Sequence, residues 1–127
     1  MYSIEPVGII HSALKRRGDA PLQGDEGAPK ARLEVFSAYA PGLEGIQKGD
    51  DIIIITWLHL ASRDVLQVHP RGDRNAPLRG VFSTRSPDRP NPVGLHQVRV
   101  LEVLERGLWI EPIEAIDGTP VVDIKPV

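Results

Sequence analysis

The residues best equipped for chemistry lie in one proline-rich stretch, residues 80–94. It carries Arg85, Arg89 and Asn91 together with three hydroxyl side chains and three prolines. Each proline fixes its own φ and pushes the residue before it towards extended geometry, so we expect a stiff loop. Arginines on a stiff backbone lose little entropy on binding, which suits recognition of an anionic or polar ligand. A connector between strands, with its arginines merely solvated, fits the same composition equally well.

Arginines also cluster immediately before this stretch and within it. The whole chain carries a net charge of −2, which argues against a domain that coats nucleic acid but allows a local basic patch. Only Asp73 and Asp88 oppose that patch within positions 71–89. Its members are Arg71, Arg74, Arg79, Arg85 and Arg89.

Several common catalytic designs are absent from the sequence. There is no cysteine, which excludes disulfides, thiolate metal sites and cysteine nucleophiles. Neither the Gly-x-Ser-x-Gly elbow of serine hydrolases nor a glycine motif that cradles phosphate occurs. The four histidines are scattered, without the spacing that would put two metal ligands on one strand face, so no metal is expected. Only His59 stands out, because it lies at the end of the longest apolar run.

Composition and length indicate one ordinary globular domain. The chain has 127 residues, of which 41% are hydrophobic and 25% charged, values close to those of an average folded protein. Its amino end has no signal-peptide pattern, and its longest apolar run is too short to cross a bilayer as a helix. We therefore expect a cytoplasmic protein without membrane association, formed by a single domain over 1–127 and lacking a second carboxyl-terminal domain.

Strand signals recur along the chain, whereas helical signals are scarce. Four consecutive isoleucines in 51–60 predict a central strand buried on both faces. Residues 39–49 allow at most a short helical turn, and the last residues, 125–126, are expected to fray. The pattern predicts an all-β barrel or sandwich with short or no helices. Beside 51–60, the predicted strands are 4–11, 32–36, 65–69, 95–104, 108–113 and 121–124.

Residues 80–95 closely resemble the signature of the TsaA-like, or TrmO-like, family of S-adenosylmethionine-dependent tRNA methyltransferases. His96 stands where this family has a small hydroxyl residue. The resemblance implies a small single-domain β-barrel that works as a homodimer and binds the methyl donor near the subunit interface. Further matches, in the same order as in the family, are 7–12, Pro21 with Gln23, 57–59 and 117–126.

The resemblance also implies a set of site residues, carried over from matching positions. Arg89, Asn91 and Lys125 are expected to bind the substrate, tRNA. The implied reaction is N-methylation of threonylcarbamoyl-adenosine beside the anticodon, and His59 and Asp117 are the candidate bases. The residues expected to bind S-adenosyl-L-methionine are Gln23, His59, Leu60, Arg85, Leu95, Glu114 and Ala115.

Two other functions remain compatible with the sequence. A barrel of this size and modest basicity suits a non-catalytic protein that binds an adenosine-type ligand and regulates something else. It also suits a methyltransferase whose acceptor is a small molecule, because a net charge of −2 provides little general attraction for tRNA.

Overall fold

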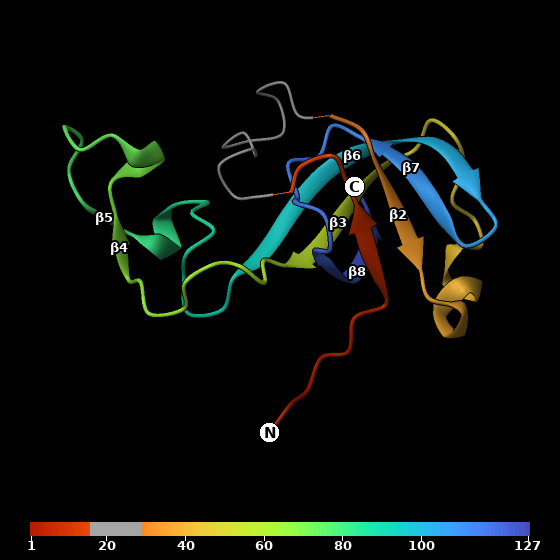
Figure 1. Ribbon diagram of the computed structural model, residues 1–127, viewed down its shortest axis with the longest axis horizontal. Helices are drawn as coiled ribbons and strands as arrows, with labels where there is room; N and C mark the ends of the chain where they lie inside the picture. Colours follow the sequence, from red (N-terminus) through yellow and green to blue (C-terminus); the bar gives the residue numbers. More distant parts are fainter. Residues whose placement is uncertain (16–28) are drawn as a thin grey trace.

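The computed structural model describes residues 1–15 and 29–127. Gln23, which is predicted to bind the methyl donor, therefore lies outside the described residues. Six antiparallel strands close into a barrel in the order β1-β2-β7-β6-β3-β8 (Figure 1). The all-β barrel prediction is confirmed. The barrel strands are β1 (Gly8–His11), β2 (Ala31–Val35), β3 (Asp51–Trp57), β6 (Val93–Leu104), β7 (Gly107–Glu111) and β8 (Pro120–Pro126).

The remaining elements are short. A second, two-stranded sheet pairs β4 (Gln67–Val68) with β5 (Arg79–Gly80), outside the barrel. Among the described residues the helical segments are 3-10 turns: η2 (Ser37–Leu43), η3 (Pro70–Gly72) and η4 (Val81–Ser83). η2 agrees with the short helical turn expected between the second and third strands.

The barrel interior is filled by alternate residues of its strands. Along β6 the buried positions are 94, 96, 98 and 100, and on β3 they are Ile52, Ile54 and Thr56. The prediction that the isoleucine run is buried on both faces is wrong, because a closed barrel has one interior and its other face points outwards. Ile53 and Ile55 are accordingly only half-buried.

Two glycines allow strands to approach β2 more closely than any side chain permits. A Cβ atom on Gly8 would lie 2.2 Å from the carbonyl oxygen of Glu34, and one on Gly107 would lie 2.2 Å from that of Leu33. Real Cβ atoms do not approach a backbone oxygen so closely. The glycines on either side of β2 are therefore required for barrel closure.

Several predicted strand boundaries differ from the structure. β1 begins at Gly8 rather than at residue 4, and β3 ends at Trp57, before Leu58, His59 and Leu60. The strand predicted at 65–69 shrinks to two residues and pairs outside the barrel. The carboxyl end does not fray as expected, because β8 continues to Pro126 and pairs with Ile52 of β3.

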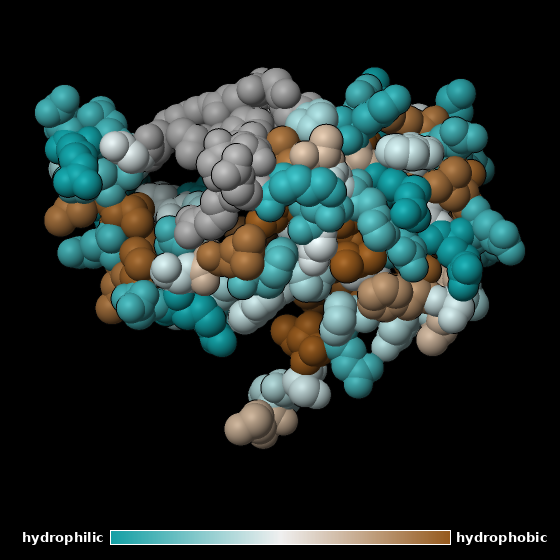
Figure 2. All heavy atoms as spheres, viewed as in Figure 1, coloured by the Kyte–Doolittle hydropathy of each residue, from teal (hydrophilic) through white to brown (hydrophobic). Residues whose placement is uncertain are grey.

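The connection from β3 to β6, residues 58–92, leaves the barrel and projects to one side of it (Figure 1). We call this segment the arm. Its two ends are joined: the Leu58 amide donates to the carbonyl of Pro92 (2.8 Å), and the Arg89 amide donates to that of Ser62 (3.0 Å). Figure 2 shows hydrophobic side chains exposed among hydrophilic ones over this part of the molecule.

Candidate functional site

One end of the barrel gathers the connections that carry most of the predicted site residues. β3 ends at Trp57 beside Val93, the first residue of β6, and Thr56 pairs with Val121 at the start of β8. β1 also ends there, because Ile9 pairs with Pro120. We call this end the mouth. The connections at the mouth carry His59, Leu60, Arg85, Arg89, Asn91, Glu114, Ala115 and Asp117.

Two predicted site residues lie on strands instead. Leu95 is on the outer face of β6, 47% exposed, and pairs with Ile55. Lys125 pairs with Ile53 near the start of β3, so it lies towards the end of the barrel opposite the mouth. Its ammonium group is 3.6 Å from the carboxylate of Asp123. The structure therefore does not bring Lys125 together with the residues at the mouth.

A buried polar network crosses the barrel just inside the mouth. The Thr56 hydroxyl lies 2.7 Å from Nε2 of His96, and Nδ1 of His96 lies 2.7 Å from Oε1 of Glu114. Thr56 and His96 are buried, whereas Glu114 is partly exposed. The network thus links β3 and β6 to the β7–β8 connection, which carries the predicted donor-binding residues Glu114 and Ala115.

The network determines the charge of Glu114. Burial by itself raises the pKa of this carboxyl, but the hydrogen bond and attraction from His96, together with a backbone hydrogen bond, outweigh burial. The net result is a pKa below the usual value for a glutamate. Glu114 is therefore an ionised acceptor at neutral pH, partly open to solvent beside the mouth.

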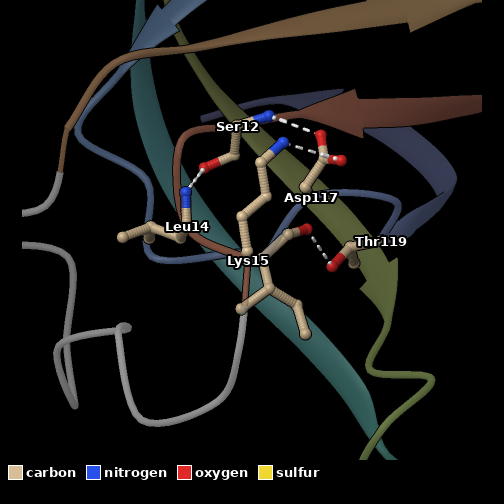
Figure 3. A network of polar contacts seen from close by, with 6 residues as sticks. Ser12, Leu14, Lys15, Asp117 and Thr119 are labelled. Atoms are coloured by element: carbon tan, nitrogen blue, oxygen red, sulfur yellow. Dashed lines mark hydrogen bonds and ion pairs between the residues drawn. The ribbon is translucent and has the colours of Figure 1, made fainter.

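Asp117 anchors the turn between β7 and β8 to the end of β1 (Figure 3). Its Oδ1 accepts a hydrogen bond from the Ser12 amide (2.9 Å), and its Oδ2 lies 3.1 Å from Nζ of Lys15. The Asp117 amide in turn donates to the carbonyl of Leu14, and the Thr119 hydroxyl donates to that of Ile116. The hydrogen bond from Ser12 and the ion pair with Lys15 lower the pKa of Asp117, which makes it a weaker base.

Asp117→Asn should lower the free energy of unfolding by about 0.5–1 kcal/mol at neutral pH. Asparagine still accepts from the Ser12 amide but loses the charge that attracts Lys15. Because the pKa of Asp117 is lower in the folded than in the unfolded chain, this stabilisation is present above the unfolded pKa and is lost as the pH falls through the folded one. Urea unfolding of both proteins on acidification should show their stabilities converging. A difference independent of pH would contradict this role of the charge.

The two arginines of the proline-rich loop have different surroundings. The Arg89 guanidinium donates to three backbone carbonyls of its own loop, those of Ser86 (2.7 Å), Val81 (2.8 Å) and Thr84 (2.6 Å). Arg85 is exposed and, among the described residues, has no hydrogen-bond or ion-pair partner. The stiff loop is therefore held by Arg89 and presents Arg85.

A third arginine, Arg63, fastens the base of the arm. It donates to the carbonyl of Pro90 (2.7 Å) and to Oδ1 of Asn91 (3.0 Å). Its guanidinium also lies over the ring of Trp57, 5.1 Å from the centroid. Asn91 is predicted to bind the substrate, but its side-chain oxygen accepts a hydrogen bond from Arg63 within the arm.

The residues that the sequence reasoning missed are His96, Thr56 and Arg63. The alternation along 94–100 places His96 on the same face as Val98 and Val100, so the sequence pattern predicts that its side chain points into the barrel. Its partners were not, because they come from separate segments. His59, the histidine singled out from the sequence, is exposed and lies beyond the end of β3.

Neither a metal-binding cluster nor a membrane-spanning helix is present in the part of the chain that the structure describes. Over 1–15 and 29–127, no three or more His, Asp or Glu side chains form a group that could hold a metal ion. In the same residues no helix is long and apolar enough to cross a membrane.

Curated relatives cover almost the entire chain. A "probable S-adenosyl-L-methionine-binding protein" of Methanothermobacter thermautotrophicus is 47% identical over 123 residues, which are 97% of this chain and 88% of the relative. An "S-adenosyl-L-methionine-binding protein" of Archaeoglobus fulgidus is 43% identical over 122 residues, which are 96% of this chain and 86% of the relative.

Solved structures share the fold over the whole chain. A crystal structure of TrmO from Pseudomonas aeruginosa matches with a TM-score of 0.80 at 28% identity, covering 100% of this chain and 56% of that one. A further crystal structure of TrmO matches with a TM-score of 0.80 at 31% identity, and the match covers 100% of this chain and 57% of that one. The chain thus spans little more than half the length of these TrmO structures. Residues 9–127 match the model of the tRNA-methyltransferase O N-terminal domain, and the chain therefore belongs to that family.

Proposed function

We propose that this protein is an S-adenosyl-L-methionine-dependent methyltransferase that acts on tRNA and methylates a nitrogen of threonylcarbamoyl-adenosine. Membership of the tRNA-methyltransferase O N-terminal domain family over residues 9–127 carries the proposal. The names of the archaeal relatives support the choice of donor.

The residues at the mouth and on the arm fit the chemistry of the methyl donor. Arg85 presents a guanidinium with no partner among the described residues, which suits the donor's carboxylate. Glu114 supplies an ionised acceptor for a hydroxyl or ammonium group. Leu60, which is 51% exposed, offers apolar surface. When bound, the donor supplies an electrophilic methyl group on a sulfonium.

The protein's own task in this reaction is alignment and removal of a proton. The acceptor nitrogen, flanked by a purine and a carbonyl, is a poor nucleophile until it loses its proton. We assign the base to His59 rather than Asp117, because Asp117 is held by Ser12 and Lys15 and its pKa is lowered. Exclusion of water and orientation of the two reactants supply the rest of the rate enhancement.

The arm supports tRNA as the partner. Residues 58–92 contain six arginines and three aspartates, a net charge of +3. Because the whole chain carries −2, the remaining residues carry −5. Attraction for phosphates is therefore concentrated on the arm, because the rest of the chain has a net negative charge.

The outer face of the barrel supports a homodimer. Val93 and Leu95 are 45% and 47% exposed on β6, and they pair with Trp57 and Ile55 of β3, whose side chains are half-buried. A contiguous apolar surface of this kind suits contact with a second copy. Analytical ultracentrifugation should show a dimer, and Leu95→Glu should shift it towards the monomer.

Two measurements on the unmodified protein test the proposed function. Calorimetric titration with S-adenosyl-L-methionine should show binding, and absence of binding by the folded protein would contradict the donor assignment. Methyl transfer is then measured on tRNA that carries threonylcarbamoyl-adenosine and on the same tRNA without that modification. Transfer that requires the modification supports the acceptor.

A second candidate is a barrel that binds the donor without catalysis. It is favoured by the names of the archaeal relatives, which describe binding and no reaction. This candidate predicts binding without turnover on any acceptor. Consumption of the donor in the presence of tRNA would rule it out.

Arg85→Ala should weaken binding of S-adenosyl-L-methionine about 10- to 100-fold, the usual loss for a hydrogen bond between charged groups. Its melting temperature should stay within about 2 °C of the parent protein, because an exposed loop side chain contributes little to stability. Arg74→Ala is the matched control, since Arg74 is also an exposed arginine of the arm. Equal loss of affinity in both variants would contradict a specific role for Arg85.

A further inference from the structure

His96 occupies an unusual position for a histidine in a small barrel. It lies on the inner face of β6, 5% exposed, between the buried positions 94 and 98. Both of its ring nitrogens have a partner within 2.7 Å, the Thr56 hydroxyl on one side and the Glu114 carboxylate on the other. A buried imidazole with two short hydrogen bonds has one defined orientation.

The Glu114 carboxylate determines the direction of one of the two hydrogen bonds. An ionised carboxylate only accepts, so Nδ1 of His96 must carry the hydrogen that is donated to Glu114. In the neutral ring Nε2 then accepts, and the Thr56 hydroxyl donates to it. Each polar atom is satisfied in this arrangement, in agreement with the absence of buried unpartnered side-chain atoms among the described residues.

Gly94 makes room for this arrangement. A Cβ atom on Gly94 would lie 2.4 Å from the Thr56 hydroxyl oxygen and 2.8 Å from Nε2 of His96. The hydrogen bond between Thr56 and His96 therefore requires glycine at this place. This contact is independent of Glu114 and points to the same orientation of the ring.

We propose that His96 is the positioning residue of the donor site: it holds the Glu114 carboxylate in one orientation, with the remaining lone pairs open to a hydroxyl or ammonium group of the donor. The inference rests on the proposed function, in which Glu114 contacts S-adenosyl-L-methionine. Glu114 is only partly buried and comes from an irregular connection, so without His96 it would adopt several rotamers. A carboxylate that is already oriented binds its ligand with a smaller loss of entropy.

Two substitutions of His96 each remove one of its two hydrogen bonds and keep the other. In His96→Asn, the side-chain amide nitrogen takes the place of Nδ1 and still donates to Glu114, while the contact with Thr56 is lost. In His96→Gln, the amide reaches the place of Nε2 near Thr56, but the side chain at position 96 no longer donates to Glu114. We expect His96→Gln to weaken binding of S-adenosyl-L-methionine about tenfold. His96→Asn should stay within about threefold of the parent. Equal losses, or a greater loss in His96→Asn, would overturn the proposal.

A double variant tests whether His96 acts through Glu114. If it does, His96→Gln combined with Glu114→Gln should bind no more weakly than Glu114→Gln alone. Additive losses would overturn the positioning role and indicate a general effect on packing. Thermal unfolding of each variant identifies any that are not folded at the temperature of the titration.

Measurements on the parent protein keep the proposal testable if the variants do not fold. Nitrogen-15 chemical shifts of the His96 ring should show that Nδ1 carries a hydrogen, and the resonance of that hydrogen should move when S-adenosyl-L-methionine is added. The other tautomer, or a resonance unchanged at saturating ligand, would overturn the proposal. Failure of the parent protein to bind the ligand would instead contradict the proposed function and leave the tautomer as the test of the contact with Glu114.

Discussion

Gly94→Ala should lower the free energy of unfolding by about 3 kcal/mol, because the new methyl group overfills a packed interior. The Cβ atom would lie 2.4 Å from the Thr56 hydroxyl oxygen and 3.1 Å from Cδ2 of Leu58. Thr56 is fully buried and His96 is held on both sides, so neither can rotate away. For a domain of this size the loss corresponds to a fall in melting temperature of roughly 10 °C.

Gly42→Ala is the matched control for this substitution. A Cβ atom there meets no heavy atom within 4 Å, and the backbone is not in the left-handed region. Its effect should stay within about 0.5 kcal/mol. Urea unfolding at constant pH gives both values. A Gly94→Ala protein as stable as the parent would show that β3 and β6 can separate at the mouth, contrary to the packing described.

Reversing two charges on the arm, with Arg74→Glu and Arg79→Glu in one protein, should weaken tRNA binding about 100-fold at 0.1 M salt. Each lost phosphate contact removes nearly one unit from the slope of log K against log salt. At 0.1 M salt, one unit of slope corresponds to a loss of tRNA affinity of close to tenfold. Both side chains are exposed and have no hydrogen-bond or ion-pair partner among the described residues. The salt slope should therefore fall by about two, while affinity for S-adenosyl-L-methionine stays unchanged.

The control reverses two charges at the other end of the barrel. Lys48 and Arg106 are exposed, in the β2–β3 connection and the β6–β7 turn, away from the mouth. Lys48→Glu with Arg106→Glu changes the net charge by the same amount and should weaken tRNA binding less than about threefold. Equal weakening in the two proteins would mean that net charge alone controls binding and would contradict the assignment to the arm. Filter binding across a salt series measures both.

Strand formation was largely predictable from the sequence, because alternation and β-branched residues act locally. The hairpin formed by β6 and β7 and the turn at Gly118 appear where the pattern places them. Closure of the sheet was not predictable in this way. It depends on pairing between distant strands, such as β1 with β8, and on the close approach that Gly8 and Gly107 permit.

The candidate site was also only partly predictable from the sequence, which located the proline-rich loop but not the surroundings of its arginines. The loop's resemblance to a family signature predicts that residues 80–94 bind a ligand, and family membership confirms the resemblance. Composition does not distinguish Arg85 from Arg89, because both are arginines of the same loop, and the resemblance assigns them different ligands without indicating how each side chain is held. Only the folded backbone separates them: three carbonyls converge on Arg89, while Arg85 remains exposed.

His59 and His96 illustrate which features the sequence determines and which features only the tertiary structure determines. The sequence by itself determined that this chain forms an all-β domain of a methyltransferase family, because strand periodicity and an ordered set of motifs are local properties. The tertiary structure decided that His96, rather than His59, lies inside the barrel between Thr56 and Glu114. That arrangement joins residues 40 and 18 positions apart in the chain, and it requires the pairing of β3 with β6 and the position of the β7–β8 connection at the mouth.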